Sequence, residues 1–273
     1  FRGYIHLKTI PEADPEVIHA AGLYADRVSI NVELPTDAGL TRLAPDKNAA
    51  QIEGAMGRTK ARIIEAKDER KRFRHAPRFA PAGQSTQMIV GADGANDTAI
   101  IGKASRLYGA FGLRRVYYSA FSPIPDASAV LPLKRPPLLR EHRLYQSDWL
   151  MRFYGFAPHE VADAAEADGN LPLDIDPKLA WALKFRASFP VDVNRAAKEQ
   201  LLRVPGLGTT AVARIITARR HRTLRLDDVA RLTASIAKVR PFICALDWRP
   251  TLLTDRADLR RLLAPRQEQL ELF

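Results

Sequence analysis

Apolar and polar residues alternate along several short stretches of the first 125 residues. The clearest stretch is 27–34, where an extended chain places its apolar side chains on one face and Ser29, Asn31 and Glu33 on the other. The pattern predicts strands over 4–9, 27–34, 86–92 and 115–121. It predicts helices over 14–25, 47–72 and 97–110 between them. Strands that alternate with helices indicate βαβ units and a parallel sheet.

The polar strand face is unusual, because parallel sheets are normally covered on both faces and their strands are continuously apolar. One interpretation is an antiparallel sheet with one face in water. The other, favoured by the intervening helices, is a partial βα barrel whose polar faces line a cavity. Idle polar groups are costly to bury, so such a cavity would be a ligand site. Its expected lining is His6, Lys8, Ser29, Asn31, Glu33 and Gln87.

The character of the chain changes after about residue 125. Residues 121–137 contain five prolines, which is typical of a linker. From about residue 139 onward, short helical stretches separated by Pro and Gly replace the strand pattern. We therefore expect an α/β domain over 1–125, a linker with bridging helices over 126–180, an all-α domain over 181–249 and a tail over 250–273. Within this tail, 267–273 reads as a frayed acidic end.

The strongest local motif is Pro205-Gly206-Leu207-Gly208-Thr209, between two predicted helices. This is the helix-hairpin-helix pattern, in which the glycines let the backbone turn and approach a ligand closely. The N–H groups at the start of the second helix then face an anion, and a DNA phosphate is the natural one. Thr209 or Thr210 is expected to cap that helix and to donate a further hydrogen bond.

The charge of the chain supports this interpretation. The net charge is +11, and residues 181–249 contain 14 Lys and Arg against 5 Asp and Glu, including Arg214 on the second hairpin helix. Such a patch attracts polyanions without reading base sequence, so DNA is the expected ligand and RNA a less favoured one. The alternative is a glycine turn between two packing helices with a solvated basic face. Residues 226–242 could form a second, degenerate hairpin that supports the first.

Composition narrows the function classes further. Cys244 is the only cysteine, which excludes a disulfide framework or a multi-cysteine metal site within this chain. No apolar run is long enough for a membrane span, and the chain opens without a signal peptide. We expect a cytoplasmic protein. Because Phe1 leads directly into a strand and four strands cannot close a barrel, we also expect further strands upstream.

Several stretches together resemble the DNA modification and repair radical SAM proteins, a family associated with a uracil-DNA-glycosylase-like partner. The matching stretches are 1–8, 26–35, 43–47, 83–92, 115–125, 141–150 and the hairpin at 201–216. The resemblance implies a partial βα barrel of the radical SAM type followed by a small helix-hairpin-helix domain. In that family, three cysteines hold a 4Fe–4S cluster that cleaves S-adenosylmethionine reductively. Those cysteines are absent here, so this chain alone is expected to be inactive.

The same resemblance implies where S-adenosylmethionine would bind. Glu33 would hold the ribose hydroxyls, with Ser29 and Asn31 on the same strand face, while Gly91 would allow close approach and Ser122 would meet the adenine. An ion pair between Glu33 and Lys8 remains an open alternative. No catalytic residue is identified, and no metal ligand is expected within the chain. The alternative function is a non-catalytic DNA-binding adaptor that recruits a glycosylase-like partner.

Overall fold

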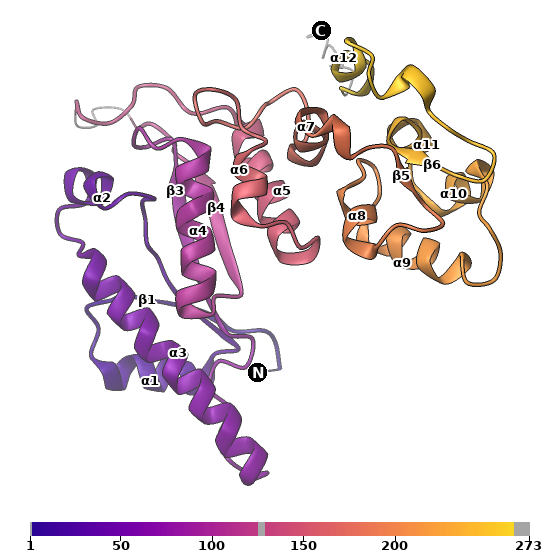
Figure 1. The fold of residues 1–273 in the computed structure, drawn as a ribbon. Helices are drawn as coiled ribbons and strands as arrows, with labels where there is room; N and C mark the ends of the chain where they lie inside the picture. Colours follow the sequence, from indigo (N-terminus) through magenta and orange to yellow (C-terminus); the bar gives the residue numbers. More distant parts are fainter. Residues whose placement is uncertain (1, 125–128, 265–273) are drawn as a thin grey trace, which may run out of the picture. The chain divides into compact units, whose positions relative to one another are not determined.

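The computed structural model describes residues 2–124 and 129–264 (Figure 1). The chain divides into two compact units, Phe1–Glu141 and His142–Phe273. The segment 126–180, expected as a linker with bridging helices, is therefore shared between the two units. The predicted acidic tail, 267–273, lies outside the described residues. Among the described helices, none is both long enough and apolar enough to cross a membrane.

The first unit is built on a four-stranded parallel sheet in the order β1-β2-β3-β4. Its strands are β1 (His6–Thr9), β2 (Arg27–Ile30), β3 (Gln84–Val90) and β4 (Arg115–Ala120). Its helices are α1 (Pro15–Tyr24), α2 (Asp37–Leu43), α3 (Ala49–Arg72) and α4 (Asp97–Phe111). The predicted α/β class with a parallel sheet is confirmed, and the antiparallel alternative is wrong. Helix α2 was not predicted.

Local sequence explains where several helices begin. Asp14 accepts a hydrogen bond from the Glu16 N–H at 2.7 Å, and Pro15 occupies the first turn of α1. The Asn48 side chain caps the first turn of α3 in the same way. At the carboxyl end of α4, Gly112 adopts φ +61°, a left-handed conformation that ends the helix.

The apolar strand positions form the core of this unit together with the helices. Val28, Met88 and Val116 are fully buried. Helix α3 lies against β2, β3 and α4 (Figure 1). The buried helix residues that complete the core include Ile52, Met56, Ile100, Ile101 and Leu107. Full burial of one such side chain contributes roughly 1.5–3 kcal/mol, so this face fixes the sheet and leaves the polar face for other roles.

The second unit contains mainly short helices. They are α6 (Pro158–Ala162), α7 (Pro177–Lys184), α8 (Lys198–Arg203), α9 (Thr209–Ala218), α10 (Leu226–Leu232), α11 (Ile236–Val239) and α12 (Leu259–Leu263), with α5 (Leu138–Phe153) leading into them. Short 3-10 turns occur at Arg186–Ser188, Arg240–Phe242 and Thr251–Leu253. Two strands of two residues, β5 (Val191–Asp192) and β6 (Ile243–Cys244), pair in parallel. No strand was predicted in this part of the sequence, because two residues are too short to show a period.

Candidate functional site

The polar face of the sheet is built by strand register. Lys8 of β1 is level with Ser29 of β2, and Ser29 is level with Ser85 of β3. Alternate residues of each strand point to the same side, so polar positions from neighbouring strands lie beside one another. Ser29 and Asn31 are each 6% exposed, which places them within the protein rather than in bulk water. Asn31 Nδ2 donates to Gln87 Oε1 at 3.4 Å.

The strand predicted over 27–34 is wrong beyond Ile30. The regular ladder of β2 stops there, and the Val32 N–H donates to the Thr86 side-chain oxygen at 3.0 Å instead. Glu33 has φ 62°, in the left-handed region, which breaks the simple alternation. The Glu33 N–H donates to the Gln87 carbonyl and its own carbonyl accepts from the Ile89 N–H, so a single bridge holds this conformation. Such a backbone costs roughly 1–3 kcal/mol, and strained residues of this kind cluster at functional sites.

The Glu33 carboxylate nevertheless lies on the polar side. Its Oε1 is 3.8 Å from Lys8 Nζ, and its side chain is 23% exposed against 60% for Lys8. The ion pair considered as an alternative for Glu33 is therefore present. A long pair with one exposed partner contributes little, typically under about 1 kcal/mol, so the carboxylate can still accept hydrogen bonds from other donors.

Gly91 and Ser122 follow β3 and β4, so parallel topology puts them at the same edge of the sheet as Glu33. Gly91 has φ +81°, and a Cβ there would lie 2.8 Å from Pro136 Cγ. The close approach that Gly91 permits in this structure is to Pro136. Ser122 is exposed in the loop after β4.

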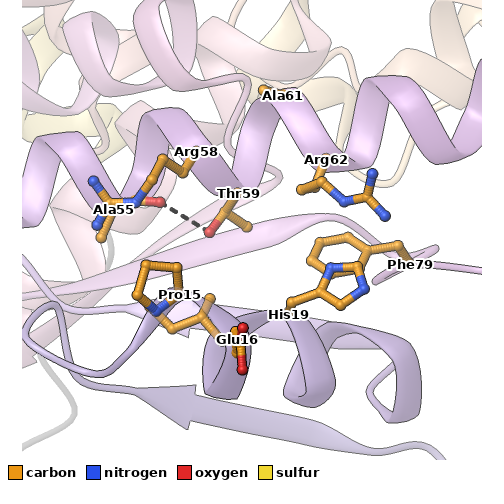
Figure 2. Close-up of a pocket in the computed structure, with 10 residues that line it drawn as sticks. Pro15, Glu16, His19, Ala55, Arg58, Thr59, Ala61, Arg62 and Phe79 are labelled. Carbon is orange, nitrogen blue, oxygen red and sulfur yellow. Dashed lines mark hydrogen bonds between the residues drawn. The ribbon is translucent and has the colours of Figure 1, made fainter.

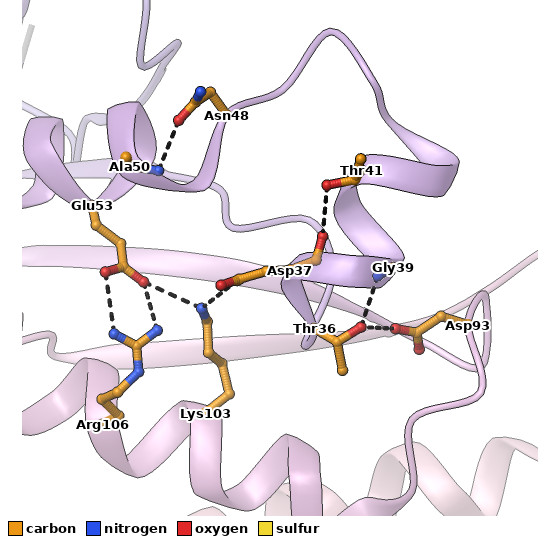
Figure 3. Close-up of polar contacts among 10 residues, drawn as sticks. All are labelled: Thr36, Asp37, Gly39, Thr41, Asn48, Ala50, Glu53, Asp93, Lys103 and Arg106. Atoms are coloured by element: carbon orange, nitrogen blue, oxygen red, sulfur yellow. Dashed lines mark hydrogen bonds and ion pairs between the residues drawn. The ribbon is translucent and has the colours of Figure 1, made fainter.

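Hydrogen bonds fix the loops at this edge (Figure 3). The Thr36 hydroxyl donates to Asp93 Oδ2 at 3.0 Å and accepts from the Gly39 N–H at 2.9 Å. Asp93 follows β3, while Thr36 follows β2, so the two loops are tied to each other. At the carboxyl end of the sheet, the loops after β2 and β3 are thus joined through Thr36 and Asp93.

The second candidate region is the turn between α8 and α9. Gly206 has φ +83°, and a Cβ there would lie 2.8 Å from Val239 Cγ2. Gly208 has an ordinary φ of −83° and caps α9, with room for a Cβ 3.7 Å from the Tyr154 hydroxyl. Gly206 is therefore needed by the turn and its packing on α11, whereas a Cβ at Gly208 would make only an ordinary contact.

The first turn of α9 carries unpaired backbone donors. The Val212 N–H donates to the Gly208 carbonyl, but among the described residues no acceptor contacts the N–H groups of 208–211. Thr209 and Thr210 are both exposed there. The expected threonine cap is wrong, because Gly208 takes the N-cap position and makes no side-chain cap. Without a cap, these N–H groups lie at the positive end of the helix dipole with no acceptor among the described residues.

The hairpin turn is supported from inside by a buried lysine. Lys178 of α7 donates from Nζ to the Leu207 carbonyl at 2.6 Å, and its ammonium lies 4.7 Å from the centre of the Tyr154 ring. Burial is the main cause that lowers the pKa of Lys178 from 10.5 to about 7. Nothing in the sequence distinguishes this lysine from one on a solvated helix face.

The arginines near the hairpin fall into two groups. Arg203 pairs with Glu160, Arg219 donates to the Ala196 carbonyl at 2.7 Å, and Arg222 pairs with Asp228, so these three are structural. A second group is exposed and forms no ion pair within the described part of the chain: Arg214, Arg220 and Arg225. This second group is free to meet a polyanion.

The first hairpin helix begins after a turn made by polar residues. Helix α8 begins at Lys198, and the Ala197 N–H donates to Gln200 Oε1 at 3.0 Å. Asp192 accepts from the Asn194 N–H at 2.8 Å. The polar residues before α8 therefore form their own turn, next to the short pair of β5 and β6.

A groove of about 710 Å³ lies on the helical side of the sheet and was not anticipated from the sequence (Figure 2). It runs between α1 and α3, where Ile18, Ala55 and Thr59 contribute to its lining. His19 stacks on Phe79 with ring centres 5.5 Å apart. Because α1 and α3 cover the apolar strand face, this groove is separate from the polar face.

No group of three or more His, Cys, Asp or Glu side chains placed to hold a metal occurs among the described residues. Comparison with models of protein families, with curated proteins and with solved structures found no match to this chain.

Proposed function

We propose that this chain binds the DNA backbone through a helix-hairpin-helix formed by α8, the glycine turn and α9. The observation that carries the proposal is the set of unpaired N–H groups at 208–211 in the described structure, at the start of the helix that also carries the exposed Arg214. Backbone N–H groups and arginines are the usual partners of phosphate oxygens. These contacts do not involve base edges, so binding is independent of base sequence.

The proposal extends to the first unit as the carboxy-terminal part of a radical SAM partial βα barrel. The sheet supports it through its parallel strands in chain order and its single polar face. Within the described sheet, β1 has a partner on one side only, which leaves room for upstream strands. The protein would then modify or repair DNA in a reducing compartment such as the cytoplasm, in keeping with its single cysteine.

A radical SAM enzyme binds two groups, an iron–sulfur cluster and S-adenosylmethionine, and the residues of this chain suit them differently. Cys244 lies on β6 in the second unit, so the chain does not supply the thiolates for an iron–sulfur cluster. The polar edge fits S-adenosylmethionine better, because the Glu33 carboxylate can accept hydrogen bonds from ribose hydroxyls. Ser29 and Asn31 would add polar contacts beside it, and Ser122 would lie at the adenine end.

The lack of cluster ligands favours one alternative, a non-catalytic adaptor that binds DNA and recruits a uracil-DNA-glycosylase-like partner. The sequence upstream of Phe1 separates the two functions. A CxxxCxxC run there supports the enzyme. An adaptor would lack that run, and a glycosylase-like protein would bind directly to the adaptor.

Two assays test the proposal. Fluorescence anisotropy with this chain and duplex DNA of unrelated sequences is expected to show similar affinities at low salt, and the absence of binding contradicts the DNA proposal. A protein that carries the upstream cysteines, loaded with iron and sulfide and then reduced, is expected to cleave S-adenosylmethionine. Failure to cleave it, with the cluster intact by absorbance, contradicts the enzyme and leaves the adaptor.

A further inference from the structure

Arg27 of β2 is a cation with incomplete hydrogen bonding on the polar face of the sheet. It is level with His6 of β1 and lies two residues before Ser29, towards the amino ends of the strands. Its two terminal nitrogens make only long contacts, to the Tyr117 hydroxyl and to the Ala82 carbonyl, each at 3.4 Å. Its Nε is enclosed and has no hydrogen-bond partner among the described residues.

Within the described part of the chain, no carboxylate forms an ion pair with Arg27. The neighbouring Asp26 is turned away, because its Oδ2 accepts from the Ile5 N–H at 2.8 Å. A half-buried guanidinium with weak hydrogen bonds and no counter-charge is costly to maintain. An anion from outside would remove that cost.

Other donors converge on the same place. His6 Nε2 lies 3.4 Å from the Ser85 hydroxyl, and its ring centre is 6.4 Å from that of Tyr117. Burial, followed by the charge of Arg27, lowers the pKa of His6 and so favours the neutral imidazole, which can donate one hydrogen bond. Arg115 of β4 lies 4.7 Å over the Tyr117 ring. Strands β1, β3 and β4 thus place neutral or positive groups near Arg27.

We propose that Arg27, His6, Ser85 and Tyr117 form a binding site for a tetrahedral oxyanion of the phosphate class. A guanidinium fork pairs with two oxygens of such an anion, and hydroxyl and imidazole donors can reach the others. The site lies near the amino ends of the strands, away from Glu33 at their carboxyl ends. It is therefore a site beyond the proposed function and does not depend on it.

Sulfate is the appropriate first probe, because its charge is constant near neutral pH. Sodium sulfate is titrated into the full chain at constant ionic strength, and backbone amide shifts are followed by NMR. Saturable shifts are expected at residues 6, 85 and 117. Arg27→Gln is expected to weaken this binding about tenfold or more, since it removes the charged fork. Arg74→Gln makes the same charge change at an exposed position and serves as the matched control.

If circular dichroism shows that Arg27→Gln disturbs the sheet, a second variant can still test the proposal. Tyr117→Phe retains the ring under Arg115 and removes one hydroxyl, so a loss of about fivefold is expected. Shifts that do not saturate, or that are equal in the wild type and both site variants, overturn the proposal. Repeating the titration with a short single-stranded oligonucleotide identifies the source of the anion. Competition with sulfate indicates a nucleic-acid phosphate, and its absence indicates a small free oxyanion.

Discussion

Lys178 shows how one buried charge can link pH to the hairpin. Its pKa in the folded chain is about 7, well below 10.5, so the unfolded chain binds more protons between these values. Stability therefore rises with pH across this window, because the cost of burying the ammonium disappears as it loses its proton. Its hydrogen bond to the Leu207 carbonyl places this effect directly beneath the glycine turn.

The expected size of this effect is on the order of 3 kcal/mol between about pH 7 and about pH 9.5. Urea unfolding of the wild type and of Lys178→Met measures it, because methionine keeps the apolar stem and cannot titrate. The rise with pH should be much smaller in Lys178→Met, while Lys198→Met, at an exposed lysine, should behave like the wild type. An equal rise in all three proteins would contradict this role for Lys178.

The two hairpin glycines are expected to respond differently to substitution. Gly206→Val forces a β-branched residue into φ +83° and against Val239, so a loss of roughly 2–5 kcal/mol of stability is expected from strain and overpacking. Gly208→Ala meets only ordinary contacts and should cost about 1 kcal/mol or less. Urea unfolding checks both values, and equal losses would contradict this division of roles.

At the residue scale, the sequence was informative where backbone conformation alone set the requirement. Gly206 could be recognised because a Gly-x-Gly run between two helical stretches is typical of a tight turn that only glycine forms without strain. Arg27 carried a usable signal, since it alternates with Ser29 and Asn31 and so shares their face. Lys178 carried none, because its burial depends on the packing of α7 beneath a turn distant in sequence.

At the element scale, α3 and α4 are joined by one carboxylate. Glu53 accepts a bidentate pair from Arg106, at 2.5 and 3.1 Å, and a bond from Lys103 at 3.2 Å (Figure 3). The hydrogen bond from Arg106 is the largest cause that lowers the pKa of Glu53. The carboxylate is therefore more favourable in the folded chain than in the unfolded chain.

Glu53→Gln is expected to lower the free energy of unfolding by about 1–2 kcal/mol at neutral pH. Since the pKa is lowered from 4.5, this contribution is present above about pH 4.5 and is lost as the pH falls through the folded value. The difference between the two proteins should therefore shrink in acid. Unfolding curves at several pH values test this, and a difference that stays constant down to about pH 3 would contradict it.

Periodic patterns placed the long elements well. The strands of the sheet and α1, α3 and α4 lie within a few residues of their predicted bounds, because each has a buried face that repeats. The end of β2 could not be predicted, since the left-handed backbone conformation of Glu33 is held by hydrogen bonds to β3. The two-residue strands β5 and β6 and the short α2 have too few residues to show a period.

At the scale of the whole molecule, charge is concentrated where the proposed anion-binding turn lies. The stretch 181–249 has a net charge of +9 from 14 basic and 5 acidic residues, against +11 for the chain. This asymmetry was visible in the sequence. The sequence did not show which arginines are available to bind DNA. Arg203, Arg219 and Arg222 are not, because each binds a group within the protein that the sequence pattern does not reveal.

The salt dependence of DNA binding tests this assignment. Replacing Arg214, Arg220 and Arg225 together with Gln should reduce the slope of log affinity against log salt by about 0.9 for each lost phosphate contact. The triple replacement of Arg72, Arg74 and Arg78 makes an equal charge change on exposed positions of the first unit. Its slope should match the wild type. Equal slopes in both triple variants would show that general charge, not the hairpin, binds DNA.

The DNA affinity of Gly208→Asp shows whether the N–H groups at the start of α9 bind phosphate. Aspartate is a better N-cap than glycine, so its carboxylate should occupy the N–H groups at the start of α9 and keep or raise stability by about 0.5 kcal/mol. Those are the N–H groups proposed to bind phosphate. By fluorescence anisotropy, affinity for duplex DNA should fall about tenfold or more, whereas Ala187→Asp, an exposed change of equal charge, should have little effect. A stable Gly208→Asp protein that binds DNA as tightly as Ala187→Asp would contradict phosphate binding by these N–H groups.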